Sequence, residues 1–253
     1  MIQIVIIGSG NVAQHLIMAF AKSKEIEIVQ VFSRKKESVV PLLDSSKITD
    51  NYNDLAKADL YIISVSDDAI ASVSSQLPFE NRLVVHTSGS VPLDSLDKKN
   101  RKGIFYPLQT FTKGKEVDFS TIPFCLESEN DKDFEILEKV AKTISNNIYK
   151  TDEKQRKALH ISAVFVNNFV NEMYRIGNEI CEENKVPFEI LKPLILETVN
   201  KVMTLSPEEA QTGPAKRNDK KTINAHLDFL SNENHATIYK ILTQSIQNNG
   251  KEL

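Results

Sequence analysis

The sequence predicts an α/β protein in which a doubly wound parallel sheet is followed by an all-helical domain. Three observations carry this prediction. Short apolar, β-rich runs alternate with stretches of helical periodicity in the first half of the chain. A glycine-rich strand–turn–helix pattern opens the sequence, and no convincing strand follows Asp152. The 253 residues are enough for two domains, which we place at residues 1–150 and 151–253.

Six strands separated by helices make up the first domain. The expected strands are Ile2–Ile7, Ile28–Phe32, Leu60–Ser64, Leu83–His86, Gly103–Tyr106 and Pro123–Glu127. Apolar strands that alternate with helices are typical of a parallel sheet covered on both faces. Helical spacing of apolar residues is found at Asn11–Ser23 and Lys132–Ser145.

The second domain opens with one long helix, expected from about Asp152 to Asn184. Asp152 and Gln155 have the spacing of a capping box. Because the middle of this helix is apolar over most of its circumference, we expect it to be buried on several sides. Further helices are expected at Pro187–Leu205, after the start signal at Ser206, near Lys221–Leu230 and near Asn234–Gln247.

Composition excludes several classes of protein. Thirty-one Lys and Arg against 34 Asp and Glu give a net charge of −3, which argues against a dedicated nucleic-acid binder. The two cysteines are far apart, so we expect neither a disulfide framework nor a metal site. No apolar stretch is long enough to span a membrane, and the N-terminus is typical of a strand rather than a signal peptide. We therefore expect a cytoplasmic protein.

The first strand runs into the pattern G-x-G-x-x-A. Gly8 allows a tight turn, Gly10 lets a pyrophosphate approach the backbone, and Ala13 permits close helix–strand packing. The helix N-terminus then offers free N–H groups to phosphates. The pattern predicts a Rossmann-type dinucleotide site, and the alternative is an ordinary turn with coincidental glycines. The expected cofactor contacts here are Gly8, Ser9, Gly10, Asn11 and Val12.

The residues after the second strand select the dinucleotide. NAD enzymes usually carry Asp or Glu there to hold the ribose 2′-hydroxyl. This chain has Ser33, Arg34 and Lys35 instead. Ser33 can donate to a 2′-phosphate, and Arg34 can pair with it and stack on adenine. We therefore expect NADP(H), and the alternative is a solvated basic loop.

Small polar residues follow the next strands, at the edge of the sheet where ligands of such folds bind. They supply hydrogen bonds without bulk near the ribose, the nicotinamide and the substrate. The alternative is plain turn chemistry, with Asp67 or Asp68 capping the following helix. The polar candidates at this edge are Ser66, Thr87, Ser88 and Gln109, and the apolar Val65 beside Ser66 is a further candidate cofactor contact.

Polar residues also mark the long helix. At 100° per residue, His160, Asn167, Asn171 and Asn178 fall near one face, and Asn168 lies about 80° away. They could line a cleft or bond to neighbouring helices. Histidine is the side chain that most readily exchanges a proton near neutral pH, so His160 is a candidate general acid, the alternative being a structural histidine.

A break in the helical pattern at residues 212–219 leaves two interpretations open. Arg217 and Asp219 form an ion pair that holds a turn between helices, or Arg217 meets an anionic group of a substrate.

The order and spacing of several motifs resemble one bacterial family. These motifs are GSGNVA, VFSRK, ISVSDDAI, VVHTSGSVP, FYPLQTF, the helix with H-x7-N, and GPAKRND followed by TINAHL. The family comprises Rossmann-like putative NADP oxidoreductases with an uncharacterised helical C-terminal domain. It is related to pyrroline-5-carboxylate reductase and deazaflavin-dependent NADP oxidoreductase, within the 6-phosphogluconate dehydrogenase-like superfamily. The resemblance implies a homodimer formed through the helical domain.

The resemblance also implies roles for single residues. Ser88 matches a substrate-binding serine of β-hydroxyacid dehydrogenases, Gln109 is brought near the substrate, and Asn168 matches the usual asparagine of the helix. These dehydrogenases carry a catalytic lysine four residues before an asparagine, whereas here His160 is followed by Val164 at that spacing. The dehydrogenase mechanism is therefore not transferred.

Together these patterns predict an NADPH-dependent oxidoreductase that reduces a small carbonyl or imine substrate between its domains. His160 would donate the proton, and Ser88, Gln109 and Asn168 would orient the substrate. The alternative is a non-catalytic NADP-binding or sensing module whose helical domain serves for dimerisation.

Overall fold

The computed structural model describes residues 1–248. Contacts divide the chain after Asn168 into a sheet unit, residues 1–168, and a helical unit that begins at Phe169. The last strand ends at Lys150, and the first turns of the long helix group with the sheet. The domain junction near Lys150 stays a prediction. Within the described residues, no helix is both long and apolar enough to cross a membrane.

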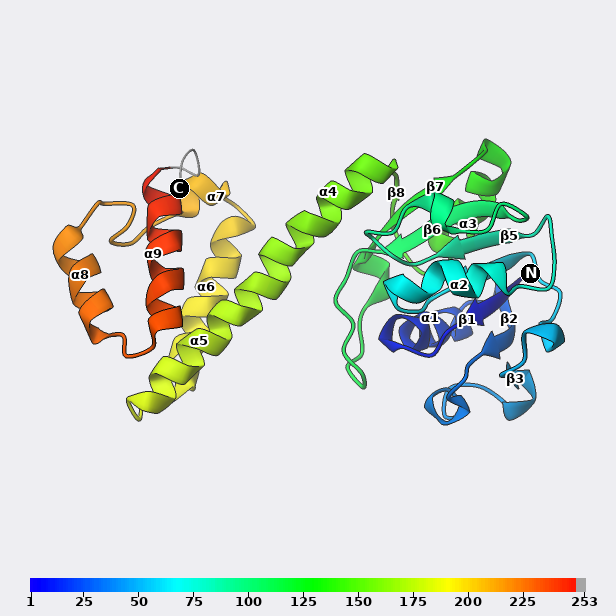
Figure 1. The fold of residues 1–253 in the computed structure, drawn as a ribbon, viewed down its shortest axis with the longest axis horizontal. Coiled ribbons are helices and arrows are strands. Elements are labelled where there is room, and N and C mark those ends of the chain that lie inside the picture. The colour runs from blue at the N-terminus through cyan, green and yellow to red at the C-terminus, as the bar shows by residue number, and fades with distance from the viewer. Residues whose placement is uncertain (249–253) are drawn as a thin grey trace. The chain divides into compact units, whose positions relative to one another are not determined.

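Eight strands form one sheet in the order β3-β2-β1-β4-β5-β6-β7-β8 (Figure 1). They are β1 (Ile2–Ile7), β2 (Ile26–Phe32), β3 (Ile48–Thr49), β4 (Leu60–Ile63), β5 (Leu83–His86), β6 (Arg101–Pro107), β7 (Pro123–Ser128) and β8 (Asn147–Lys150). The order confirms the doubly wound α/β fold. The short strands β3 and β8 are not apparent from the sequence pattern.

The pairing of β7 differs from the expected parallel sheet, because β7 runs antiparallel to β6. A parallel neighbour requires a crossover connection, usually through a helix, whereas an antiparallel one needs only a loop. Residues 108–122, between β6 and β7, contain only a 3-10 turn at Phe119–Thr121 and no α-helix. The parallel set that shapes the site is therefore β2, β1, β4, β5 and β6.

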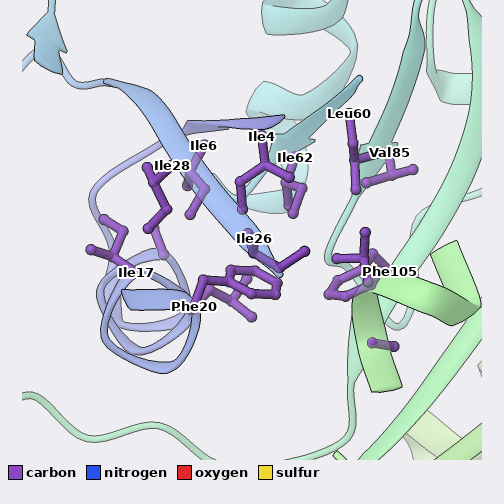
Figure 2. Packing of buried hydrophobic residues seen from close by; sticks show 14 of the residues in the cluster. Ile4, Ile6, Ile17, Phe20, Ile26, Ile28, Leu60, Ile62, Val85 and Phe105 are labelled. Atoms are coloured by element: carbon purple, nitrogen blue, oxygen red, sulfur yellow. The ribbon is translucent and has the colours of Figure 1, made fainter. Parts of the chain in front are cut away.

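Alternate residues of the strands pack into two cores, one on each face of the sheet. Ile4 and Ile6 join one cluster with Phe20 of helix α1 (Asn11–Ala21), and helix α3 (Asp131–Lys142) contributes to it. Figure 2 shows this packing. Val5 and Ile7 join the other cluster, with helix α2 (Ile70–Ser75). Burial on both faces fixes the strand ends and hence the positions of the loops that follow them.

The predicted long helix is present as α4 (Glu153–Ala163), a π-helical segment (Val164–Phe169) and α5 (Val170–Glu183). The capping box formed by Asp152 and Gln155 is confirmed. The remaining helices are α6 (Lys192–Val202), α7 (Pro207–Ala210), α8 (Lys220–Phe229) and α9 (Glu233–Gln247). Ser206 caps α7, as predicted from its start signal.

The expectation that the long helix is buried on several sides is wrong for the single chain. Phe165 is 61% exposed and Val166 is 73% exposed. Periodicity shows that a helix carries apolar residues, but it does not show which surface covers them.

Of the two interpretations left open for residues 212–219, the ion pair is not found, since none of the ion pairs among residues 1–248 joins Arg217 and Asp219. The Asp219 carboxylate instead accepts a hydrogen bond from the Thr222 amide and caps α8. The same interaction holds the pKa of Asp219 below its usual value.

Candidate active site

One cavity of about 1230 Å³ lies within the sheet unit. It exceeds the roughly 300–1,000 Å³ of a common small-ligand pocket, which suits a dinucleotide together with a small substrate. It opens at the carboxyl ends of the parallel strands, where the loops after β1, β2, β4, β5 and β6 meet. Its lining includes these predicted site residues: Gly8, Ser9, Gly10, Asn11, Val12, Ser33, Arg34, Lys35, Val65, Ser66, Thr87, Gln109, His160 and Asn168.

The glycine turn after β1 has the geometry that a pyrophosphate requires. Gly8 has φ +134°, and a Cβ there would lie 2.0 Å from the carbonyl oxygen of Ser64, so only glycine fits. Gly10 precedes α1, no side chain caps this helix N-terminus, and a Cβ on Gly10 would meet nothing within 4 Å. Uncapped N–H groups beside open space can receive phosphate oxygens, so the residues present fit a dinucleotide.

The three cationic side chains of the loop after β2 differ in whether they form an ion pair. Arg34 and Lys35 are exposed and line the cavity, whereas Lys36 forms an ion pair with Asp50 at 3.0 Å. The hydroxyl of the buried Ser33 donates to the Lys35 carbonyl at 2.9 Å and accepts from the Lys35 amide at 3.1 Å. Ser33 therefore shapes the loop, and the positive charges of Arg34 and Lys35 face solvent.

Buried hydrogen bonds fix the loop after β5, residues 87–91. The Ser88 hydroxyl accepts from the amides of Ser90 and Val91, both at 3.1 Å, so Ser88 holds the loop together and is absent from the cavity lining. Asp67 accepts a hydrogen bond from the Ser90 hydroxyl at 2.5 Å. Neither Asp67 nor Asp68 caps α2 through its side chain.

His86, the last residue of β5, also forms hydrogen bonds with this part of the chain. Its Nδ1 accepts a hydrogen bond from the Ser88 amide at 3.2 Å, and its Nε2 lies 3.4 Å from the carbonyl oxygen of Pro92. Burial lowers the pKa of His86 to about 4, and the positive charge of Arg156 acts in the same direction. His86 is therefore neutral in the folded protein at neutral pH, with its proton on Nε2.

Tyr106, at the end of β6, contacts His160 on α4. The Tyr106 hydroxyl oxygen lies 3.3 Å from His160 Nδ1, and both side chains line the cavity. A Cβ on Gly89 would lie 2.6 Å from Tyr106 Cζ and 2.8 Å from His160 Nδ1. The two rings can therefore meet only because residue 89 has no side chain. Burial raises the pKa of Tyr106 to about 12, so its hydroxyl stays protonated.

Arg156 lies one helical turn before His160 and is fully buried. Its guanidinium donates to the carbonyl oxygens of Gly89 at 3.3 Å and Val91 at 2.8 Å, and to the Glu127 carboxylate at 3.2 Å. Arg156 thereby ties α4 to both the 87–91 loop and β7. The residue needs these partners, because an unpaired buried cation is costly.

The sequence patterns miss two residues that line the cavity, Tyr106 and Tyr52, and one buried residue that supports it, Arg156. Tyr52 stacks on Phe32 at 4.2 Å between ring centroids and adds an aromatic wall beside Arg34. A usable signal exists for Arg156, which precedes His160 by four residues on one helix face. Tyr106 lies only three residues before Gln109, in a segment already identified as a site loop.

The π-helical segment changes the phase of the predicted polar stripe. Its turns are wider than those of an α-helix, so 100° per residue does not apply across it, and both Asn167 and Asn168 line the cavity. Asn171 and Asn178 belong to the helical unit, where Asn178 donates to Glu182 at 2.7 Å. Gln109 lines the cavity while its amide oxygen accepts from the Thr110 amide.

No group of three or more His, Cys, Asp or Glu side chains within residues 1–248 is placed to hold a metal ion.

Comparison with family models gives two matches. Residues 3–89 match the family described as NADP oxidoreductase, coenzyme F420-dependent. Residues 122–246 match a domain of unknown function, DUF2520. No protein with a curated description matches the chain.

Solved structures give matches over nearly the whole chain. A putative NADP oxidoreductase from Bacteroides fragilis is 40% identical, with a TM-score of 0.89 and 98% of each chain covered. A Thermotoga maritima protein is 18% identical, with a TM-score of 0.79 and coverage of 98% of this chain and 100% of that one. Pyrroline-5-carboxylate reductase from Streptococcus pyogenes shares the fold at 15% identity, with a TM-score of 0.65 and coverage of 100% and 99%. The chain therefore belongs to the family of Rossmann-type NADP oxidoreductases that includes the Bacteroides fragilis protein.

Proposed function

We propose that this protein is an NADPH-dependent reductase that acts on a small carbonyl or imine compound. The observation that supports this proposal is one cavity lined both by the glycine turn with Arg34 and by the hydrogen-bonded side chains of Tyr106 and His160. NADP is also the cofactor named for the family to which the chain belongs.

The chain's own residues would hold the cofactor in two places. The turn from Gly8 to Val12 and the N-terminus of α1 would bind the pyrophosphate. Arg34 and Lys35 would pair with the 2′-phosphate. Four strand spacings separate β2, which precedes Arg34, from β6, which carries Tyr106. At about 4.8 Å each this is about 19 Å, a distance that calls for an elongated ligand.

Val65 and Ser66 follow β4 and Thr87 follows β5, between these ends of the sheet edge, and they would contact the ribose and the nicotinamide side. Bound NADPH supplies a hydride to the substrate C=O or C=N carbon, leaving NADP⁺. The task of the protein is to hold the substrate carbon close to the nicotinamide.

Gln109 and Asn168 would orient the substrate by hydrogen bonds, and His160 would donate a proton to its oxygen or nitrogen. Ser88 would contribute through the loop that it holds. The substrate carbon gains a hydride and the heteroatom gains a proton, so the reduction is balanced.

We also propose that residues 1–150 form the NADP-binding domain and that residues 151–253 contribute to the substrate site and form a homodimer. The support for dimerisation is the large apolar surface of the helical unit, where Leu194 is 63% exposed and Met203 is 78% exposed. The free thiols of Cys125 and Cys181 suit a reducing, cytoplasmic location.

The test is NADPH oxidation, followed by absorbance, with a panel of aldehydes, keto acids and cyclic imines. We expect turnover with at least one class. We expect His160→Ala to lower kcat at least about 100-fold, as loss of a general acid does, while the NADPH Kd is unchanged. NADPH binding without turnover across the panel would instead support the alternative, a non-catalytic NADP-binding module.

A further inference from the structure

We propose that Tyr106 is a positioning residue that fixes the tautomer of His160, keeping the imidazole proton on Nε2. The inference rests on the proposed function, because it assigns Nε2 as the nitrogen that gives a proton to the substrate. It concerns the arrangement of protons within the sheet unit, so it can be tested without turnover.

The Tyr106 hydroxyl and the His160 imidazole have few hydrogen-bond partners. Tyr106 is 9% exposed, and His160 Nδ1, at 3.3 Å, is the one hydrogen-bond partner that the described residues offer its hydroxyl. A buried hydroxyl proton requires an acceptor, and an imidazole nitrogen accepts only when it carries no proton. If Nδ1 carried the proton, the Tyr106 O–H would have no acceptor among these residues. The arrangement therefore favours Tyr106 as donor, Nδ1 as acceptor and the imidazole proton on Nε2.

Surrounding contacts hold the two rings in place. Gly89 contacts both rings. Arg156 donates a hydrogen bond to the Gly89 carbonyl oxygen and lies on the same face of α4 as His160. Three ionisable groups act on Tyr106: Cys125 and Asp67 raise the pKa of its hydroxyl, and Arg156 lowers it. Because these contacts come from the 87–91 loop, β6 and α4 together, neither ring can rotate freely.

Proton delivery uses both side chains. When the Nε2 proton passes to the substrate oxygen or nitrogen, the Tyr106 proton moves to Nδ1, so the imidazole stays neutral and Tyr106 is left as a phenolate. A proton from water then binds at Nε2 on the cavity side, and the Nδ1 proton returns to the Tyr106 oxygen, which restores the resting state. One proton enters from water for each proton delivered, and His160 never has to become an anion.

The experiment measures the His160 tautomer by ¹⁵N NMR at about pH 8, where imidazole side chains are neutral. His160→Ala identifies the His160 signals among the five histidines. We expect only the Nε2–H form in the unmodified protein and a mixture of both forms in Tyr106→Phe, which keeps the ring against Gly89. We expect kcat of Tyr106→Phe to fall about tenfold while the NADPH Kd and the substrate KM are unchanged.

A matched control exists in the helical unit, where the Tyr239 hydroxyl lies 2.8 Å from His226 Nδ1. Tyr239→Phe removes the same kind of bond and should leave the His160 tautomer and kcat unchanged. An Nδ1–H form in the unmodified protein, or the same tautomer in Tyr106→Phe, overturns the inference even if the enzyme turns over. The expected NMR result supports the inference even without turnover, a case in which the proposed function alone fails.

Discussion

The sheet unit and the helical unit treat their apolar side chains in opposite ways. In the sheet unit, Ile4, Ile6 and Phe105 are completely buried, because helices from the same chain cover the strands. In the helical unit, Ile190 is 65% exposed and Met203 is 78% exposed. The sheet unit therefore completes its own core and shapes a cavity. The helical unit leaves apolar side chains uncovered, and we propose that a second copy of the chain covers them.

The sharpest test of the self-contained sheet unit is Gly8→Ala. The new Cβ would lie 2.0 Å from the Ser64 carbonyl oxygen, at a φ of +134° that alanine does not adopt without strain. We expect the free energy of unfolding to fall by about 3 kcal/mol or more, and NADPH binding to be lost. Urea unfolding followed by circular dichroism, with NADPH titration, measures both.

Gly10→Ala is the matched control for this change, since a Cβ there meets nothing within 4 Å. It should change the free energy of unfolding by less than about 1 kcal/mol. Its methyl group would, however, occupy space that the pyrophosphate needs. If Gly8→Ala were as stable as the unmodified protein, the described turn geometry would be wrong.

The exposed face of the helical unit predicts the next largest effect. Leu194→Glu on α6 places a charge on a 63% exposed apolar position, so we expect the dimer dissociation constant to rise about 100-fold. Asn200→Asp, which adds a charge at an exposed polar position of the same helix, should change it less than about threefold. Analytical ultracentrifugation measures both. A monomeric unmodified protein at micromolar concentration would contradict the proposed dimer.

His86 predicts a smaller, pH-dependent effect in the sheet unit. Its pKa is about 4 in the folded protein, below the usual 6.5. Between these two values the unfolded chain binds more protons than the folded protein does. Stability is therefore lost between about pH 6.5 and pH 4, and we expect a loss of about 2 kcal/mol between pH 7.5 and pH 5. The His86→Asn variant keeps an acceptor for the Ser88 amide. Its loss of stability over this pH range should be smaller by about 2 kcal/mol. Equal losses would show that His86 is not the group responsible.

Local patterns were enough to predict the parts of the fold that depend on neighbours in sequence. The glycine turn, the capping box at Asp152 and the positions of the main strands follow from spacing and composition alone. The supports of the site do not, because they join distant segments. Tyr106 and His160 are 54 residues apart, and Arg156 and Gly89 are 67 apart. No periodicity encodes such contacts, and a cap such as Asp219 is hard to distinguish from an ion-pair partner by composition.

In the long helix, two other features could not be predicted from the sequence. The apolar character of the long helix is evident from the sequence, but its burial is a property of whatever covers it, which the sequence does not name. The π-helical segment is also hidden from a fixed 100° repeat, and it decides that Asn167 and Asn168 line the cavity together.

A comparison of NADPH and NADH affinity by fluorescence titration tests most directly whether this cavity holds NADPH. Arg34 is free to pair with a 2′-phosphate, whereas Lys36 is already bonded to Asp50. We expect the unmodified protein to prefer NADPH by about tenfold or more, Arg34→Ala to lose that preference, and Lys36→Ala to keep it. Equal affinity for the two dinucleotides in the unmodified protein, or no binding of either, would contradict the account.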